Sequence, residues 1–283
     1  MKHEDYVSRL PTAFLRAIEF IQAVVYGIDR VTLWCDGQHA PLIPDNIYDE
    51  CTDIDVHPND CKYHRSYPWK IELLQPSGKA LRLLQSSFGK RHRSKVIYVE
   101  LACDFIVPGR QVASQLMAFL LEHVAPKHSS QPVTFFKSTA YYSPRSNQAG
   151  KKTSRNLVIY ADKNSKLRSS HCKRACCHIE WRLSGARKLE HIGIRCLADL
   201  ISFNHQKFWR QTLACYQLPK LQKIGEWLRN GNEYVGDAAQ RKAANKFLSA
   251  YRENDVTPLQ NVVADNHDFH ALLTPINGRH LFK

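Results

Sequence analysis

Three segments in the middle of the chain alternate between apolar and polar side chains. They are Lys95 to Phe105, Asn156 to Asp162 and Arg174 to Leu183. Because successive side chains of a strand point to opposite faces, this pattern predicts three strands, each with one apolar and one polar face. We expect the apolar faces to be covered by helices. The polar faces then form the other side of one sheet, which could simply face water.

The expected apolar face of the first segment is well defined. Its members are Ile97, Val99, Leu101, Cys103 and Phe105. The polar faces of the three segments carry side chains that could bind a metal ion or react with a substrate. Their members are Tyr98, Glu100, Ala102 and Asp104, then Asn156, Val158, Tyr160 and Asp162, and finally Arg174, Cys176, His178, Glu180 and Arg182.

The first half of the chain contains further periodic segments. Helical spacing over Pro11 to Ile28 predicts a helix, Val31 to Asp36 a short strand, and residues 37–68 a loop. Pro76-Ser77-Gly78 separates two short segments, Trp69 to Gln75 and Lys79 to Gln85, which predicts a hairpin. A helix is expected over Arg110 to Val124 and one or two strands over Val133 to Ser143.

After residue 185 the pattern turns helical. This order of elements predicts an α+β fold, with a mainly antiparallel sheet covered on one face by helices and an all-helical C-terminal region. The expected domains are an α+β core over residues 1–185 and a helical region over residues 186–283. The expected helices of the second region are Ala186 to Phe203, His205 to Tyr216, Pro219 to Asn230 and Gly236 to Arg252.

The net charge of the chain limits the kinds of molecule that it is expected to bind. Lys and Arg number 40 and Asp and Glu 26, which gives a formal net charge of +14. Such a surplus suits a polyanion, and nucleic acid is the commonest one in a cytoplasm. Membrane insertion and secretion are not expected, because no apolar run approaches the roughly 20 residues of a span and Met1 to Asp5 shows no signal peptide. Nine cysteines, an odd number, indicate reduced thiols and a cytoplasmic protein.

The polar faces suggest a metal site. Brought together in one sheet, Glu100, Asp104, Glu180 and His178 could hold a hard divalent cation such as Mg²⁺ or Mn²⁺. Tyr160 beside such an ion is a potential nucleophile toward phosphate. Tyr98, Tyr141 and Tyr142 are the alternatives. A zinc site at His171, Cys172, Cys176, Cys177 and His178 is disfavoured, because the strand sends Cys176 and Cys177 to opposite faces.

Residues 95–192 resemble the replication initiators of rolling-circle plasmids and filamentous phages. The order of motifs carries the resemblance. The motifs are Tyr98-Val99-Glu100-Leu101-Ala102-Cys103-Asp104, then Thr139-Ala140-Tyr141-Tyr142-Ser143-Pro144-Arg145-Ser146, then Asn156-Leu157-Val158-Ile159-Tyr160-Ala161-Asp162-Lys163, and last His178-Ile179-Glu180-Trp181-Arg182-Leu183.

The resemblance implies metal-dependent nicking of one DNA strand at an origin. Tyr160 would attack the phosphate and form a 5′-phosphotyrosine, leaving a 3′-hydroxyl to prime synthesis. Lys163 would add positive charge beside the phenolate or the phosphate. The implied partners are origin DNA, single-stranded or supercoiled, and a host helicase, with a homodimer left open. Mobilisation of DNA by a related relaxase-like reaction is a further alternative.

Cations surround the tyrosine strand on both sides. They would follow the DNA backbone beside the active centre, although a solvated basic loop would have the same composition. A DNA-binding regulator of plasmid or phage replication without catalysis is the alternative function, because the C-terminal helices are also rich in cations. The residues expected to contact DNA are Lys151, Lys152, Arg155, Lys166, Arg168, Lys173, Arg174 and Arg182.

Overall fold

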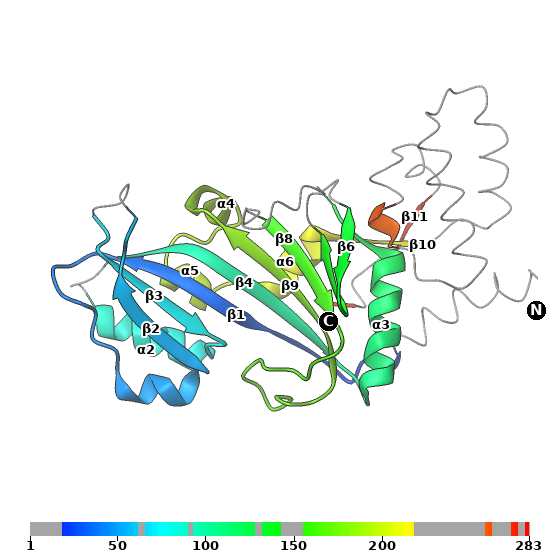
Figure 1. Ribbon diagram of the computed structural model, residues 1–283, viewed down its shortest axis with the longest axis horizontal. Coiled ribbons are helices and arrows are strands. Elements are labelled where there is room, and N and C mark those ends of the chain that lie inside the picture. The colour runs from blue at the N-terminus through cyan, green and yellow to red at the C-terminus, as the bar shows by residue number, and fades with distance from the viewer. Residues whose placement is uncertain are drawn as a thin grey trace, which may run out of the picture.

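An eight-stranded antiparallel sheet dominates the computed structural model (Figure 1). The structure describes residues 19–61, 66–89, 93–127, 132–142, 155–217, 258–261, 273–276 and 281–282. The strands follow the order β2-β3-β1-β4-β9-β8-β7-β6. Their bounds are β1 Ala23–Cys35, β2 Asp53–Pro58, β3 Trp69–Leu74, β4 Ser94–Ile106, β6 Val133–Phe136, β7 Thr139–Tyr142, β8 Arg155–Tyr160 and β9 Cys176–Ser184.

A smaller sheet and several helices complete the described fold. The smaller sheet has the order β11-β10-β5, with β5 Val124–Pro126, β10 Leu213–Gln217 and β11 Thr274–Ile276. The helices are the 3₁₀ helix η1 Asp45–Glu50 and the α-helices α2 Gly78–Phe88, α3 Arg110–His123, α4 Ala186–His191, α5 Leu197–Ile201 and α6 His205–Thr212. The α+β fold with a mainly antiparallel sheet is therefore confirmed.

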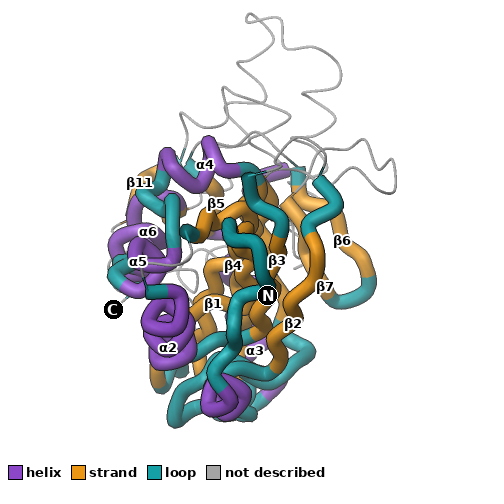
Figure 2. Tube along the Cα trace, turned by 90° about the vertical axis from the view of Figure 1, so that its left-hand side faces the viewer, coloured by secondary structure: helices purple, strands orange, loops and turns teal. Residues whose placement is uncertain are grey.

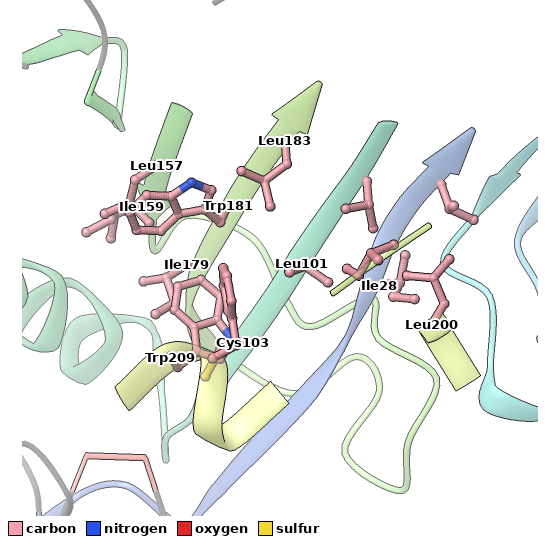
Figure 3. Packing of buried hydrophobic residues seen from close by; sticks show 14 of the residues in the cluster. Ile28, Leu101, Cys103, Leu157, Ile159, Ile179, Trp181, Leu183, Leu200 and Trp209 are labelled. Atoms are coloured by element: carbon pink, nitrogen blue, oxygen red, sulfur yellow. The ribbon is translucent and has the colours of Figure 1, made fainter. Parts of the chain in front are cut away.

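The helices pack against one face of the large sheet and bury its apolar side (Figure 2). Trp181 of β9 lies in this core and meets Trp209 of α6 edge-on, with ring centroids 6.4 Å apart. Leu200 of α5 joins the same cluster (Figure 3). The residues on either side of position 185 therefore share one hydrophobic core. The opposite face of the sheet is here called the open face.

The three alternating segments form β4, β8 and β9, as expected. In β4 the side chains of Val99, Leu101, Cys103 and Phe105 are fully buried in the core. Ile97 was expected beside them, but Val96 takes its place. The reason is a shift in register, because Thr32 of β1 pairs with Tyr98 and the next residue, Leu33, pairs with Val96. Ile97 is the extra residue of this bulge.

The helix expected over Pro11 to Ile28 is wrong where the structure describes it. Residues 23–28 belong to β1, which continues through the short strand expected at Val31 to Asp36. β1 lies between β3 and β4 and pairs with both. Those two ladders of backbone hydrogen bonds outweigh a local helical spacing of apolar residues. Residues 11–18 lie outside the described residues.

The hairpin expected around Pro76-Ser77-Gly78 is also wrong. β3 precedes these residues, but the helix α2 follows them. Ser77 caps this helix, since its hydroxyl oxygen accepts hydrogen bonds from the backbone N–H groups of Lys79 and Ala80. The buried residues of α2 recur at helical spacing and face the core. They are Ala80, Leu81, Leu84 and Phe88.

The remaining boundaries differ in detail. The expected loop over residues 37–68 contains η1 and β2, and the segment Val133 to Ser143 forms two strands, β6 and β7. The helix expected over Ala186 to Phe203 is divided into α4 and α5, with Gly193 between them at a φ of 84°. The helix expected over His205 to Tyr216 ends at Thr212 and continues as β10. The helices expected over 219–230 and 236–252 lie outside the described residues.

Within the described ranges, none of the helices has the length and apolar character needed to cross a bilayer.

His205 makes the stability of this core depend on pH. Its ring lies 5.1 Å from that of Phe203 and 6.3 Å from that of Tyr26, and its Nδ1 is buried with no hydrogen-bond partner in the described part of the chain. Burial lowers the pKa of His205 from 6.5 to about 4. The unfolded chain therefore binds a proton that the folded chain excludes, so stability falls as the pH drops from 6.5 to 4.

We predict that the variant His205→Phe loses this part of the pH dependence. Between pH 7.5 and pH 4 the free energy of unfolding should fall by about 2 kcal/mol more in the wild type than in the variant. Urea unfolding of both proteins across this range measures the difference. Parallel stability curves would show that His205 is protonated as easily in the folded chain as in the unfolded one.

Candidate functional site

Cross-strand pairing brings the predicted site residues together on the open face. Tyr160 of β8 pairs with His178 of β9, and His178 pairs with Asp104 of β4. Paired residues of neighbouring strands project to the same face, so these three side chains form one row across the sheet. A parallel row contains Asn156, Arg182 and Glu100. Glu180 lies between the two rows on β9.

A chain of charged groups runs through these rows. His178 bonds Asp104 through Nδ1 at 2.5 Å and Glu180 through Nε2 at 3.2 Å. Arg182 donates from Nε to Glu180 at 2.5 Å, and its guanidinium is 3.6 Å from Glu100. The phenol of Tyr98 donates to Glu100. Asp104, His178, Glu180 and Glu100 are all buried.

These contacts shift the pKa values of the buried groups. Burial alone would lower the pKa of His178, but its hydrogen bonds to Asp104 and Glu180 raise it to about 10, so the ring is an imidazolium at neutral pH. Burial opposes ionisation of Glu180 too, yet the bonds from His178 and Arg182 lower its pKa. The pKa of Glu100 is raised by burial and by the negative charge of Glu180.

Tyr160 lies directly on this chain. Its ring stacks on that of His178, with centroids 4.4 Å apart and planes inclined by 25°. Burial raises the pKa of Tyr160 above its usual value of 10, and the charges of Glu180, Asp29 and Asp104 raise it further. Lys163 opposes these charges, because its Nζ is 5.2 Å from the centre of the Tyr160 ring. The phenol therefore needs added positive charge to ionise at neutral pH.

Asp29 is a site residue that the sequence analysis missed. One ligand atom each of Asp29, His178 and Glu180 lies within 4.8 Å of the others. Two carboxylates and an imidazole could together hold Mn²⁺, which would have to replace the proton on one nitrogen of the His178 imidazolium. They suit Mg²⁺ less well because of the nitrogen. Asp104 would then hold the second nitrogen of His178, the usual partner of a metal-bound imidazole. The donor set therefore fits the cation that the resemblance implies.

A β-bulge explains why Asp29 escaped notice. Ile28 of β1 pairs with Leu101 and Arg30 pairs with Glu100, so Asp29 is an extra residue between two regular pairs. Bulges re-aim side chains and occur often next to functional sites. Gln75 fixes the bulged residue, since its side-chain amide donates to Asp29 Oδ1 at 2.8 Å and its backbone N–H donates to the Asp29 carbonyl. Helical spacing had assigned the residues just before Asp29 to a helix.

The predicted ligands are thus divided between two roles. His178 and Glu180 lie in the possible coordination shell. Asp104 lies behind His178, and Glu100 lies one row away, where it bonds Tyr98 and approaches Arg182 and Arg30.

The segment 161–175, here called the strap, covers one side of this cluster. The Ser165 hydroxyl donates to Asp104, and Leu167 is buried against β1. Gly27 permits this contact, because a Cβ at its position would come within 3.0 Å of a Leu167 methyl group. Arg168 donates to the Cys51 carbonyl at 2.6 Å. The strap therefore closes the Asp104 end of the cluster to water.

The cluster borders a polar groove of about 510 Å³ on the other side. Three carboxylates, Asp29, Glu72 and Glu100, line it together with three cations, Arg30, Lys70 and Arg182. Asn156 contributes a side-chain oxygen that is buried and has no hydrogen-bond partner among the described residues. A substrate in this groove would therefore reach Asp29 and Glu100, whereas His178, Glu180 and Tyr160 do not line it.

The predicted DNA-contacting cations are in several environments. Lys166 and Lys173 are exposed on the strap. Arg168 and Arg174 are exposed but bond Cys51 and Gln22. Arg182 belongs to the buried charge chain. Lys151 and Lys152 lie outside the described residues, and Arg155 is described only as the first residue of β8.

The alternative nucleophiles Tyr98, Tyr141 and Tyr142 lie in different environments. Tyr142 is buried in the core, whereas Tyr141 is half-buried on the open face and pairs with Val158. Tyr98 is bonded to Glu100. Cys176 and Cys177 lie on opposite faces of β9, and in the part of the chain that the structure describes neither belongs to a cluster of metal-ligating side chains.

The chain matches no model of a known protein family, and a comparison with curated protein sequences finds no related sequence either. The site therefore has to be interpreted from its own geometry.

We predict that Asp104→Asn destabilises the fold strongly. The substitution keeps the size of the side chain but leaves the His178 imidazolium with one carboxylate in a buried setting. Breaking such a pair costs about 3 kcal/mol or more. Urea unfolding measures this loss. The control is Asp53→Asn on the surface of β2, which should change the free energy of unfolding by less than about 0.5 kcal/mol. Equal effects of the two substitutions would mean that the charge chain contributes nothing to stability.

Proposed function

We propose that this protein nicks one strand of origin DNA through Tyr160 and so starts replication by a rolling-circle mechanism. One observation carries the proposal. Tyr160 stacks on His178 at the point where Asp29, His178 and Glu180 come within 4.8 Å of one another. A tyrosine beside a set of hard-cation ligands is suited to attack on phosphate.

Each residue has a defined role in this reaction. The Tyr160 oxygen attacks the phosphorus, the bond to the 3′-oxygen breaks, and the 5′-phosphate stays on the tyrosine. The phenol loses its proton and the leaving 3′-oxygen gains one. Lys163 stabilises the phenolate, because its ammonium group lies over the same ring. Asp29, His178 and Glu180 would hold Mn²⁺ or Mg²⁺. A cation bound there supplies charge that stabilises the phosphate in the transition state.

The formal net charge of the whole chain, +14, supports a nucleic-acid substrate. The groove beside these residues offers three cations, Arg30, Lys70 and Arg182, among three carboxylates, Asp29, Glu72 and Glu100. DNA at an origin, a host helicase and a cytoplasmic location belong to this proposal.

A second function has its own supporting observation. The charged groups of the cluster pair with one another, since His178 lies between Asp104 and Glu180 and Arg182 bonds Glu180. A cluster that is balanced in this way could serve only to hold the sheet together. The protein would then be a DNA-binding regulator of replication without catalysis.

We expect the wild type, given Mn²⁺ and a single-stranded or supercoiled origin, to form a DNA adduct that survives denaturation. Tyr160→Phe removes only the hydroxyl group and should abolish this adduct while DNA binding persists. The control is Tyr141→Phe, on the same face and one strand away, which should retain the adduct. Denaturing gels and mass spectrometry of the linked peptide measure both results.

Two outcomes would contradict this proposal. An adduct in Tyr160→Phe would place the nucleophile on another residue. Retention of tight origin binding by a wild type that never cleaves would favour the regulator.

Asp29→Asn tests the cation site itself. The substitution removes one charged donor but keeps the bulge, because the amide can still accept from Gln75. The Mn²⁺ concentration that gives half-maximal nicking should rise by about 10-fold or more, as it does when groups around a metal are altered. Asp53→Asn should leave it unchanged. A cation requirement that is the same in Asp29→Asn and the wild type would exclude Asp29 as a ligand.

A further inference from the structure

Two large aromatic side chains are exposed at the edge of the sheet beside Tyr160. Phe135 is 52% exposed and Phe136 is 67% exposed, and both lie on the edge strand β6. Each ring leaves apolar surface in water that a binding partner could cover. Because they are neighbours on a strand, they face opposite sides of the sheet.

The register assigns Phe136 to the open face. Thr134 pairs with Tyr141, and Tyr141 pairs with Val158, which shares its face with Tyr160. Phe136 is two residues from Thr134 and so projects to that face too. Phe135 pairs with Ala140, and Ala140 pairs with Ile159 of the core. Phe135 therefore projects to the helix-covered side.

The hairpin that carries Phe136 is anchored to the Tyr160 region. The Ser138 hydroxyl, in the turn between β6 and β7, donates to Asp162 at 2.7 Å. Asp162 lies two residues after Tyr160 and just before Lys163. β6 and β8 are separated by β7 alone, which puts them roughly 10 Å apart. The turn next to Phe136 is thus tied to the segment that follows Tyr160.

A cation accompanies the exposed ring. The Nζ of Lys137 lies 5.8 Å from the centre of the Phe136 ring, within the range of a cation–π contact. An aromatic ring next to a lysine offers a flat surface for a base and a positive charge for the adjoining phosphate. This combination is how proteins bind single strands without regard to sequence.

We propose that Phe136 is a stacking platform for a base of single-stranded DNA near the phosphate that Tyr160 attacks, with Lys137 contacting the backbone. The proposal rests on the proposed function in taking the bound strand to be the one that is cut. A duplex cannot use the platform, because its bases are stacked on one another. A second copy of the chain is a poorer occupant of this edge, since Lys137 and the net charge of +14 repel it.

The test is binding of a short, unstructured oligodeoxynucleotide, measured by fluorescence anisotropy with EDTA present so that no strand is cut. Phe136→Ala should weaken binding by about 5- to 100-fold, the usual effect of losing one stacked base. Phe136→Trp should bind as tightly as the wild type. Phe135→Ala is the matched control, with a similar exposed ring on the other face, and should weaken binding by less than about 2-fold. Binding of a duplex of the same sequence should be the same in all four proteins.

Several results would overturn the platform. Unchanged binding in Phe136→Ala, or equal losses in Phe135→Ala and Phe136→Ala, would do so. Dissociation of a dimer on Phe136→Ala, seen by analytical ultracentrifugation, would identify the edge as a contact between copies. A loss seen with RNA but not with DNA would assign the surface to another nucleic acid.

The platform and the nicking reaction can fail separately. An adduct at Tyr160 together with unchanged binding in Phe136→Ala overturns the platform and leaves the proposed function standing. A selective loss in Phe136→Ala, in a protein whose wild type forms no adduct, supports the platform on a DNA-binding protein that does not cleave.

Discussion

The buried chain of charges through Asp104, His178, Glu180 and Arg182 is the constraint on which the rest of the open face depends. Each of these groups would be costly to bury alone, and each is accepted because a neighbour of opposite charge bonds it. The pairing fixes the side chains of β4 and β9 relative to one another. It also fixes the His178 ring, on which Tyr160 stacks.

Other features of the molecule can be understood as supports of this chain. The strap closes the Asp104 end through Ser165 and Leu167, and Gly27 makes room for Leu167. The bulge in β1 brings Asp29 to the opposite end. The strap excludes water from the Asp104 side of the cluster, and the bulge places Asp29 on the side that borders the groove.

Alternation of side chains was sufficient to predict β4, β8 and β9 and the side chains that share their open face. It succeeded because these strands have one apolar and one polar face, which is a local property of the sequence. It failed at β1, which pairs with strands on both sides, and at α2, where Ser77 is a helix cap and not part of a hairpin turn. Asp29 could not be found in this way. Its place in the site depends on a one-residue shift between β1 and β4, and that shift exists only when the strands pair.

The most direct test of the account is diffraction from crystals of the protein grown with Mn²⁺ and recorded at a wavelength where manganese scatters anomalously. The account predicts one strong anomalous peak bounded by Asp29, Glu180 and the Nε2 atom of His178, with the Nδ1 atom still bonded to Asp104. A peak at another position would contradict it. So would crystals saturated with Mn²⁺ that show no peak there and keep His178 between Asp104 and Glu180.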